Sequence, residues 1–168
     1  MNTLINPYTV VIAFALILVL LDFYKPQISR MILGLFFLAM ALIVNLPMAL
    51  STPEIFVEAG KHALLPFYQW FFTVIIAWNP PLFVFPLILF EITVGVLILS
   101  KQRSTRIGLI LGALFCLFLT PIGIEEITSP LLGLAIILLL RQDFHNSLLE
   151  IAAGWLKPNR VQKSDSKG

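Results

Sequence analysis

The sequence predicts an all-α integral membrane protein. The expected fold is a four-helix transmembrane bundle with one additional N-terminal transmembrane helix, an external interfacial helix and a cytoplasmic amphipathic helix. Three observations predict it: the composition, five apolar segments, and a one-sided distribution of lysine and arginine. Of the 168 residues, 59% are hydrophobic and 12% are charged, and the mean hydropathy is +0.97. A soluble domain carries about 25% charged residues, so lipid is the solvent that suits this chain.

The apolar segments are expected to be helices, because backbone amides in hydrocarbon must be hydrogen-bonded internally. They are residues 8–24, 31–50, 82–100, 107–120 and 130–140. A crossing needs about 20 helical residues, so the last two helices must extend beyond their apolar runs. The first segment has no basic residue before it and no small-residue cleavage site after it, which favours an uncleaved helix over a signal peptide.

Basic residues predict the orientation of these spans, because they are enriched in cytoplasmic loops. With five spans, ten of the eleven lysines and arginines fall on one side; they are Lys25, Arg30, Lys101, Arg103, Arg106, Arg141, Lys157, Arg160, Lys163 and Lys167. The other side holds Lys61 and the acidic Glu54, Glu58, Glu125 and Glu126. The prediction is a protein of the bacterial inner membrane with its amino terminus outside and its carboxyl terminus in the cytoplasm.

Residues 61–79 are apolar enough to be a sixth span, but a sixth span would place the basic turn at 101–106 outside. Their many aromatic residues favour the membrane interface. We therefore expect an external helix lying on, or dipping into, the outer leaflet, with a re-entrant hairpin as the alternative. Residues 142–157 carry a stripe of apolar side chains and predict an amphipathic cytoplasmic helix. The stripe consists of Phe144, Leu148, Leu149, Ala152, Trp155 and Leu156.

These expectations divide the chain into four parts. Residues 1–29 form the first helix and a basic turn, residues 30–141 the four-helix bundle, and residues 142–157 the amphipathic helix. Residues 158–168 are polar and basic, which predicts a disordered tail.

Glu91 lies in the middle of the apolar run 82–100 and is the main candidate for chemistry. A charge there costs at least ~3 kcal/mol, so the carboxyl group must be neutral or partnered. Intramembrane acids mark pathways, proton sites or ligands, whereas a neutral glutamate can also hold two helices together. Asn45, in the second span, needs a partner across the bundle and reaches Glu91 only if the helices tilt. Together the two would form the polar end of a small cavity.

Small residues recur every four positions in the fourth span and predict close helix packing. They are Gly108, Gly112, Cys116 and Thr120, and Gly95 of the third span could meet this stripe. The single cysteine, Cys116, excludes an intrachain disulfide and is expected to be an inert buried thiol.

Other motifs are weak or missing. Glu54, Glu58 and His62 are spaced four apart and could bind a divalent metal ion, although a solvated helix face explains them equally well. The sequence contains no haem-attachment, flavin, nucleotide or nucleophilic-triad motif. The basic tail is too short to predict nucleic-acid binding.

The runs "SRMILGLFFLAMAL", "LPFYQW" and "FPLILFEITVGVLILSKQRSTRIGLILGALF" resemble DoxX-like membrane proteins over residues 30 to about 141. The resemblance implies a four-helix bundle, with Glu91 and Gly95 at the acid and glycine positions common in that family. Some members are thought to be subunits of quinone-linked membrane oxidoreductase systems, so a quinone is implied by resemblance only. The extra first span departs from the family pattern.

Three functional hypotheses fit these observations. The first is an accessory or assembly subunit of a membrane redox system, with a membrane-protein partner or a second copy of the chain. The second is a small proton-coupled transporter or lipid carrier that uses Glu91. The third is a structural scaffold. Catalysis by the isolated chain is disfavoured, since no cofactor-binding motif is present.

Overall fold

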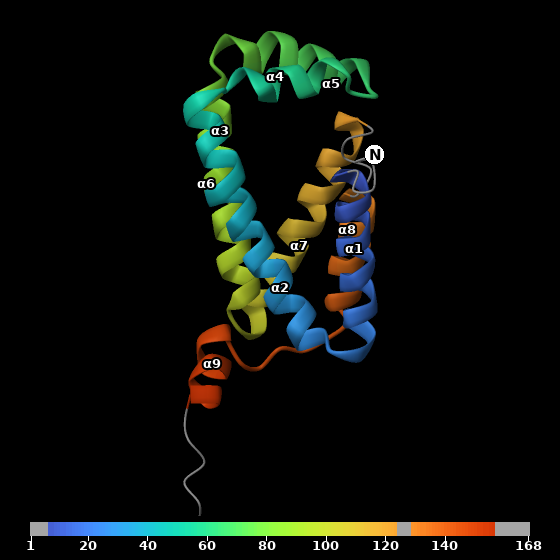
Figure 1. Ribbon diagram of the computed structural model, residues 1–168, viewed down its shortest axis with the longest axis vertical. Coiled ribbons are helices and arrows are strands. Elements are labelled where there is room, and N and C mark those ends of the chain that lie inside the picture. The colour runs from blue at the N-terminus through green and yellow to red at the C-terminus, as the bar shows by residue number, and fades with distance from the viewer. Residues whose placement is uncertain (1–6, 124–128, 157–168) are drawn as a thin grey trace, which may run out of the picture.

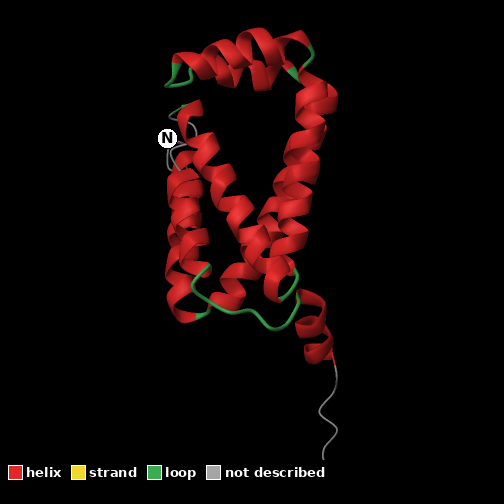
Figure 2. Ribbon diagram, turned by 180° about the vertical axis from the view of Figure 1, so that it is seen from behind, coloured by secondary structure: helices red, strands yellow, loops and turns green. Residues whose placement is uncertain are grey.

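The computed structural model describes residues 7–123 and 129–156 (Figure 1). Within these ranges every regular element is a helix, and none is a strand (Figure 2). The all-helical class is therefore confirmed. The expected tail, residues 158–168, lies outside the described residues, as do Glu125 and Glu126.

The first half of the chain forms two long apolar helices and a helical cap. Helix α1 (Pro7–Tyr24) is followed by a continuous helix that contains α2 (Pro26–Ala39), the π-helical η1 (Met40–Asn45) and α3 (Leu46–Ser51). Next come α4 (Glu54–Lys61) and a second helix made of α5 (Pro66–Trp70) and the π-helical η2 (Phe71–Ile76).

The second half forms three more apolar helices and a short terminal one. They are α6 (Pro80–Leu99), α7 (Gln102–Leu119) with a 3-10 turn η3 (Thr120–Ile122), α8 (Ser129–Leu139) and α9 (Leu148–Leu156). Proline occupies the first turn of α2, α5 and α6, where its missing N–H costs no hydrogen bond.

Three helices are long and apolar enough to cross a membrane: Pro26–Ser51, Pro80–Leu99 and Gln102–Ile122. They correspond to three of the five expected spans. The other two expected spans correspond to shorter apolar helices, described over Thr9–Tyr24 and Ser129–Leu139. Length and composition thus identify a helical chain suited to a membrane.

The segment expected as one external helix, residues 61–79, is divided. Helix α4 ends at Lys61, and the next helix begins at Pro66. The break arises because proline disfavours a helical conformation of the residue before it, and Leu65 is extended. Helices α4 and α5–η2 lie side by side across one end of the long helices (Figures 1 and 2).

The long helices converge at the opposite end and diverge toward this cap (Figure 1). Glycines permit the close approaches at the converging end. A Cβ atom on Gly95 of α6 would lie 2.9 Å from the carbonyl oxygen of Gly34 in α2. A Cβ atom on Gly108 of α7 would lie 2.7 Å from the backbone nitrogen of Ile98 in α6.

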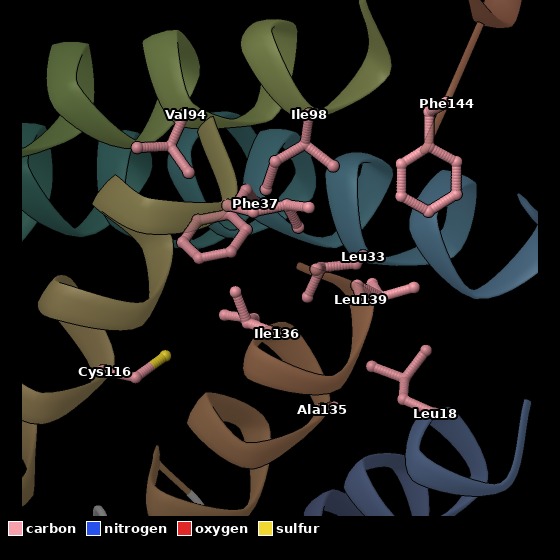
Figure 3. Close-up of a cluster of buried hydrophobic side chains, with 11 residues drawn as sticks. Leu18, Leu33, Phe37, Val94, Ile98, Cys116, Ala135, Ile136, Leu139 and Phe144 are labelled. Atoms are coloured by element: carbon pink, nitrogen blue, oxygen red, sulfur yellow. The ribbon is translucent and has the colours of Figure 1, made fainter. Parts of the chain in front are cut away.

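The apolar core lies where α1, α2, α6, α7 and α8 meet (Figure 3). Its labelled members include Leu18, Phe37, Val94 and Ile136, all at most 2% exposed. The long helices also leave many large apolar side chains exposed, for example Leu20, Leu89 and Leu117. Such a surface favours lipid as its surroundings.

A buried arginine joins three segments at the converging end. Arg30 is fully buried, and its Nη1 donates to the carbonyl oxygen of Ser100 at 2.8 Å and to Thr105 Oγ1 at 3.3 Å. Its Nη2 donates to the carbonyl oxygen of Asn146 at 2.8 Å. The guanidinium carbon also lies 4.7 Å from the ring centre of Phe144, within cation–π range. The start of α2, the α6–α7 turn and the chain after α8 are therefore held together.

The amphipathic helix expected over 142–157 is shorter than predicted, since α9 begins at Leu148. Phe144 is not on its apolar stripe, because it is buried beside Arg30 and accepts a backbone hydrogen bond from Gln102 at 2.7 Å. Ser147 and Glu150 form a reciprocal capping box that fixes the helix start. The Lys101 ammonium, together with Ser147, holds the pKa of Glu150 below its usual range.

The glycine contacts predict unequal effects of two matched substitutions. Gly108→Ala should destabilise the protein by about 1–3 kcal/mol, because the new methyl group would overlap the backbone of α6. Gly112→Ala should be nearly neutral, since its Cβ would meet Phe37 and Val94 at ordinary contact distance, 3.4 Å. Thermal unfolding of both variants in detergent measures the difference. Equal effects would contradict the described α6–α7 approach.

Candidate functional site

A cavity of about 530 Å³ lies between the diverging helices, next to the α4–α5 cap, which is formed by α4 and the helix α5–η2. Its walls come from α1, α2, η1, α6, α7 and α8, and α4 and η2 contribute to it from the capped end. The wall is mainly apolar and rich in phenylalanine; it contains Phe14, Phe36, Phe37, Phe56, Phe71, Phe72, Phe83, Phe115 and Phe118. Its volume is within the range of ligand pockets, about 300–1,000 Å³.

Asn45 and Glu91 form a polar pair on this wall. The side-chain amide of Asn45 donates from Nδ2 to Glu91 Oε2 at 2.7 Å, and both residues line the cavity. Glu91 is only 4% exposed. Ser129 of α8, which is also buried, adds a third polar side chain to the lining. The two residues that the sequence suggested as a pair are therefore in direct contact.

The pair forms although the two residues lie at different heights along antiparallel helices. Helical side chains lean toward the N-terminus of their own helix. Glu91 of α6 therefore leans toward the capped end, whereas Asn45 leans away from it, and the two side chains approach each other. Asn45 also ends the π-helical segment η1, whose wider turn changes the direction of the residues that follow. Single π turns are frequent at functional sites.

This arrangement gives an apolar ligand a polar anchoring point. An asparagine amide has two N–H donors and one acceptor oxygen, so Asn45 retains a second donor beside the one that Glu91 uses. A glutamate accepts hydrogen bonds when charged and also donates one when protonated. The pair can therefore bind a carbonyl or hydroxyl group, and Glu91 can exchange a proton with it.

The predicted small-residue stripe lies between α6 and α8. Gly108 contacts α6, Gly112 lies near Phe37, Val94 and Ile136, and Gly133 of α8 approaches Cys116. Cys116 is buried and also lines the cavity. Thr120 donates its hydroxyl to the Cys116 carbonyl oxygen at 2.9 Å.

Gly95 does not meet this stripe, contrary to the expectation. It faces Gly34 and Leu38 of α2 instead. The reason is helical phase: Gly95 is one turn from Glu91, whose face of α6 is directed toward Asn45 on the same continuous helix as Gly34.

The spaced Glu54, Glu58 and His62 do not form a metal-binding group. In the described ranges no three histidine, cysteine or acidic side chains come close enough to hold a metal ion. Glu58 instead forms an exposed ion pair with Lys61, and the Lys61 ammonium lowers the pKa of Glu58.

The sequence does not reveal two buried ionisable residues or the phenylalanine-rich wall. It identifies Arg30 only as a marker of topology, although Ser29 and Thr105 near the same helix ends point to a polar cluster. Asp22 is 4% exposed, and neither of its carboxylate oxygens has a hydrogen-bond partner within the described chain. The Ser29 hydroxyl lies beside Asp22 but donates to the Leu18 carbonyl oxygen at 3.3 Å. The position of Asp22, an acidic residue near the end of an apolar segment, is the sequence signal that points to a buried carboxyl group.

No protein-family model, curated protein or solved structure matches this chain. The fold and the site therefore define its class by themselves. It is an all-helical chain with three helices fit to cross a membrane and an aromatic cavity that carries a hydrogen-bonded asparagine–glutamate pair.

The contact between Asn45 and Glu91 predicts an energetic coupling. In a double-mutant cycle with Asn45→Ala and Glu91→Ala, we expect a coupling of about 0.6–1.7 kcal/mol, between the average and the maximum measured for hydrogen bonds between membrane helices. Thermal or denaturant unfolding in detergent gives the four stabilities. The control cycle pairs Asn45→Ala with Thr93→Ala, whose hydroxyl is bonded within its own helix, and should show no coupling. A coupling of zero in the first cycle would contradict the contact.

Proposed function

We propose that this chain is a multi-pass inner-membrane protein of DoxX-like type that binds a quinone-sized ligand as an accessory subunit of a membrane redox system. The observation that carries the proposal is the Asn45–Glu91 pair on the wall of the aromatic cavity. Polar and ionisable groups are costly to bury in an apolar protein and are by default evidence of a functional site.

The ligand is proposed from the chemistry of the wall. A quinone has a flat apolar ring with carbonyl oxygens, usually with an apolar tail. The ring can pack against phenylalanine faces, and a carbonyl oxygen can accept the second N–H of Asn45. Electrons would come from the partner enzyme, because this chain is proposed to supply binding and one titratable carboxyl group.

The proposed membrane arrangement has five spans. It is supported by the meeting of three basic connecting segments at the converging end, where Arg30 is bonded to the chain at Ser100 and Asn146. The opposite end carries the acidic helix α4 and the exposed aromatic residues Phe67, Trp70 and Trp78. Basic loops favour the cytoplasm, and aromatic residues favour the interface. The proposal therefore has the α4–α5 cap on the outer surface.

A proton-coupled transporter is the second candidate. It is favoured by the position of Glu91 on a cavity wall rather than in the packed core, where a carboxyl group can meet both solute and proton. The two candidates differ in what Glu91→Gln removes. In a transporter this substitution should abolish proton-coupled flux, whereas in a quinone site it should leave binding within about threefold, because the glutamine keeps the hydrogen-bonding shape.

Filling the cavity should abolish ligand binding. Ala59 of α4 lines the cavity, so Ala59→Phe should weaken binding of a short-tailed ubiquinone analogue by tenfold or more. The matched control is Ala77→Phe, an exposed position outside the lining, which should change binding less than twofold. Native mass spectrometry of the full chain in mild detergent measures bound analogue. Equal binding by both variants, or no binding by the wild type, would refute the quinone site.

Site-directed labelling tests the five-span arrangement. In a Cys116→Ser background, Ser104→Cys should react with a membrane-impermeant maleimide only from the cytoplasmic side. Lys61→Cys, at the end of α4, should react only from outside, and an amino-terminal reporter should also be external. External labelling at residue 104 would favour six spans instead.

A further inference from the structure

A second, polar pocket of about 260 Å³ lies at the converging end, between the start of α7 and the chain after α8. Its polar lining consists of Gln102, Arg103, Arg106, Gln142, Asp143 and His145. Its apolar lining consists of Leu109, Leu140 and Phe144. Nothing in the quinone proposal uses this pocket, which lies at the end of the bundle opposite the α4–α5 cap.

The two arginines of this pocket have no ion-pair partner among the described residues. Neither Arg103 nor Arg106 forms an ion pair with any residue that the structure describes. The neighbouring Lys101, by contrast, is already paired with Glu150. Arg103 and Arg106 are three residues apart, so they share one face of α7, where like charges repel each other. An anion between them would relieve that repulsion.

Further features of the pocket suit a phosphoryl group. Guanidinium groups bind phosphate oxygens through paired N–H donors. Helix α7 has 18 residues and starts without a side-chain cap, so the positive end of its dipole adds to the attraction. Asp143 opposes an anion, but the two arginines exceed its charge. We propose that this pocket binds a phosphate-bearing anion, and that the anion is the headgroup of an acidic phospholipid.

The depth and composition of the pocket support a lipid as the source. Arg106 directly precedes the apolar run that begins at Ile107, which is the level at which basic side chains meet headgroups. The leucines and Phe144 beside the arginines provide apolar contacts for the start of an acyl chain. Basic pockets between transmembrane helices on the cytoplasmic side bind anionic headgroups. The inference rests on the proposed membrane placement, although not on the quinone site.

The test compares lipid retention by variants of the full chain. Native mass spectrometry of protein from nanodiscs should show one tightly held phosphatidylglycerol and no matching retention of phosphatidylcholine. A basic residue near the surface contributes about fivefold to anionic-lipid binding. Arg103→Gln with Arg106→Gln should therefore weaken retention by roughly twenty-five-fold. The matched control is Arg141→Gln, which lies at the same end but outside the lining, and should change retention less than twofold.

A variant that should strengthen lipid retention distinguishes a change in binding from a loss of folding. Asp143→Asn removes the opposing charge and should tighten phosphatidylglycerol retention severalfold, which an unfolded protein cannot do. Competition with inorganic phosphate separates the sources: displacement at low millimolar phosphate assigns the site to free phosphate, and no displacement assigns it to the lipid. Unchanged retention in both the double-arginine and Asp143→Asn variants would overturn the proposal. These readouts need neither quinone nor the cavity variants, so the two proposals can fail separately.

Discussion

The buried guanidinium of Arg30 is the interaction on which the arrangement of the helices depends. A charged group in an apolar interior needs hydrogen-bond partners to offset the cost of its burial. The two terminal nitrogens of the guanidinium have partners at Ser100 and Thr105 in the α6–α7 turn and at Asn146 after α8, whereas Nε has none within the described chain. The start of α2, the α6–α7 turn and the chain after α8 must therefore meet at one point, which sets the height of α2 against α6 and α7 at the converging end.

Two residue types, glycine and phenylalanine, occupy opposite ends of the helical bundle. Glycines at the converging end, including Gly34, Gly95 and Gly108, let the backbones approach closely. Phenylalanines fill the walls where the helices separate toward the cap. The cavity of about 530 Å³ lies in this widening space. The divergence is visible in both views (Figures 1 and 2).

The sequence predicted the helical class and the positions of the apolar helices well, because hydrocarbon length and internal hydrogen bonding leave few alternatives. It predicted poorly the features that depend on contacts between distant segments. Phe144 fitted an amphipathic stripe by periodicity, but its packing beside Arg30 removes it from the helix. The partner of Gly95 depended on helical phase between α2 and α6, which spacing within one helix does not reveal. The cavity depends on the relative tilt of several helices, and no single segment encodes that tilt.

The hydrogen-bond partners of Arg30 and Glu91 distinguish a structural role from a functional one. Arg30 bonds mainly to backbone carbonyl oxygens, which cannot turn away, so a ligand would have to break the connections between helices to compete for it. Glu91 instead accepts from the side chain of Asn45 on a cavity wall. That bond can be exchanged by rotating one amide, and a ligand that offers an equivalent group leaves no buried donor unsatisfied. An exchangeable hydrogen bond facing an apolar space is what a reversible site requires, and it is the physical reason for placing the function at Glu91 rather than at Arg30.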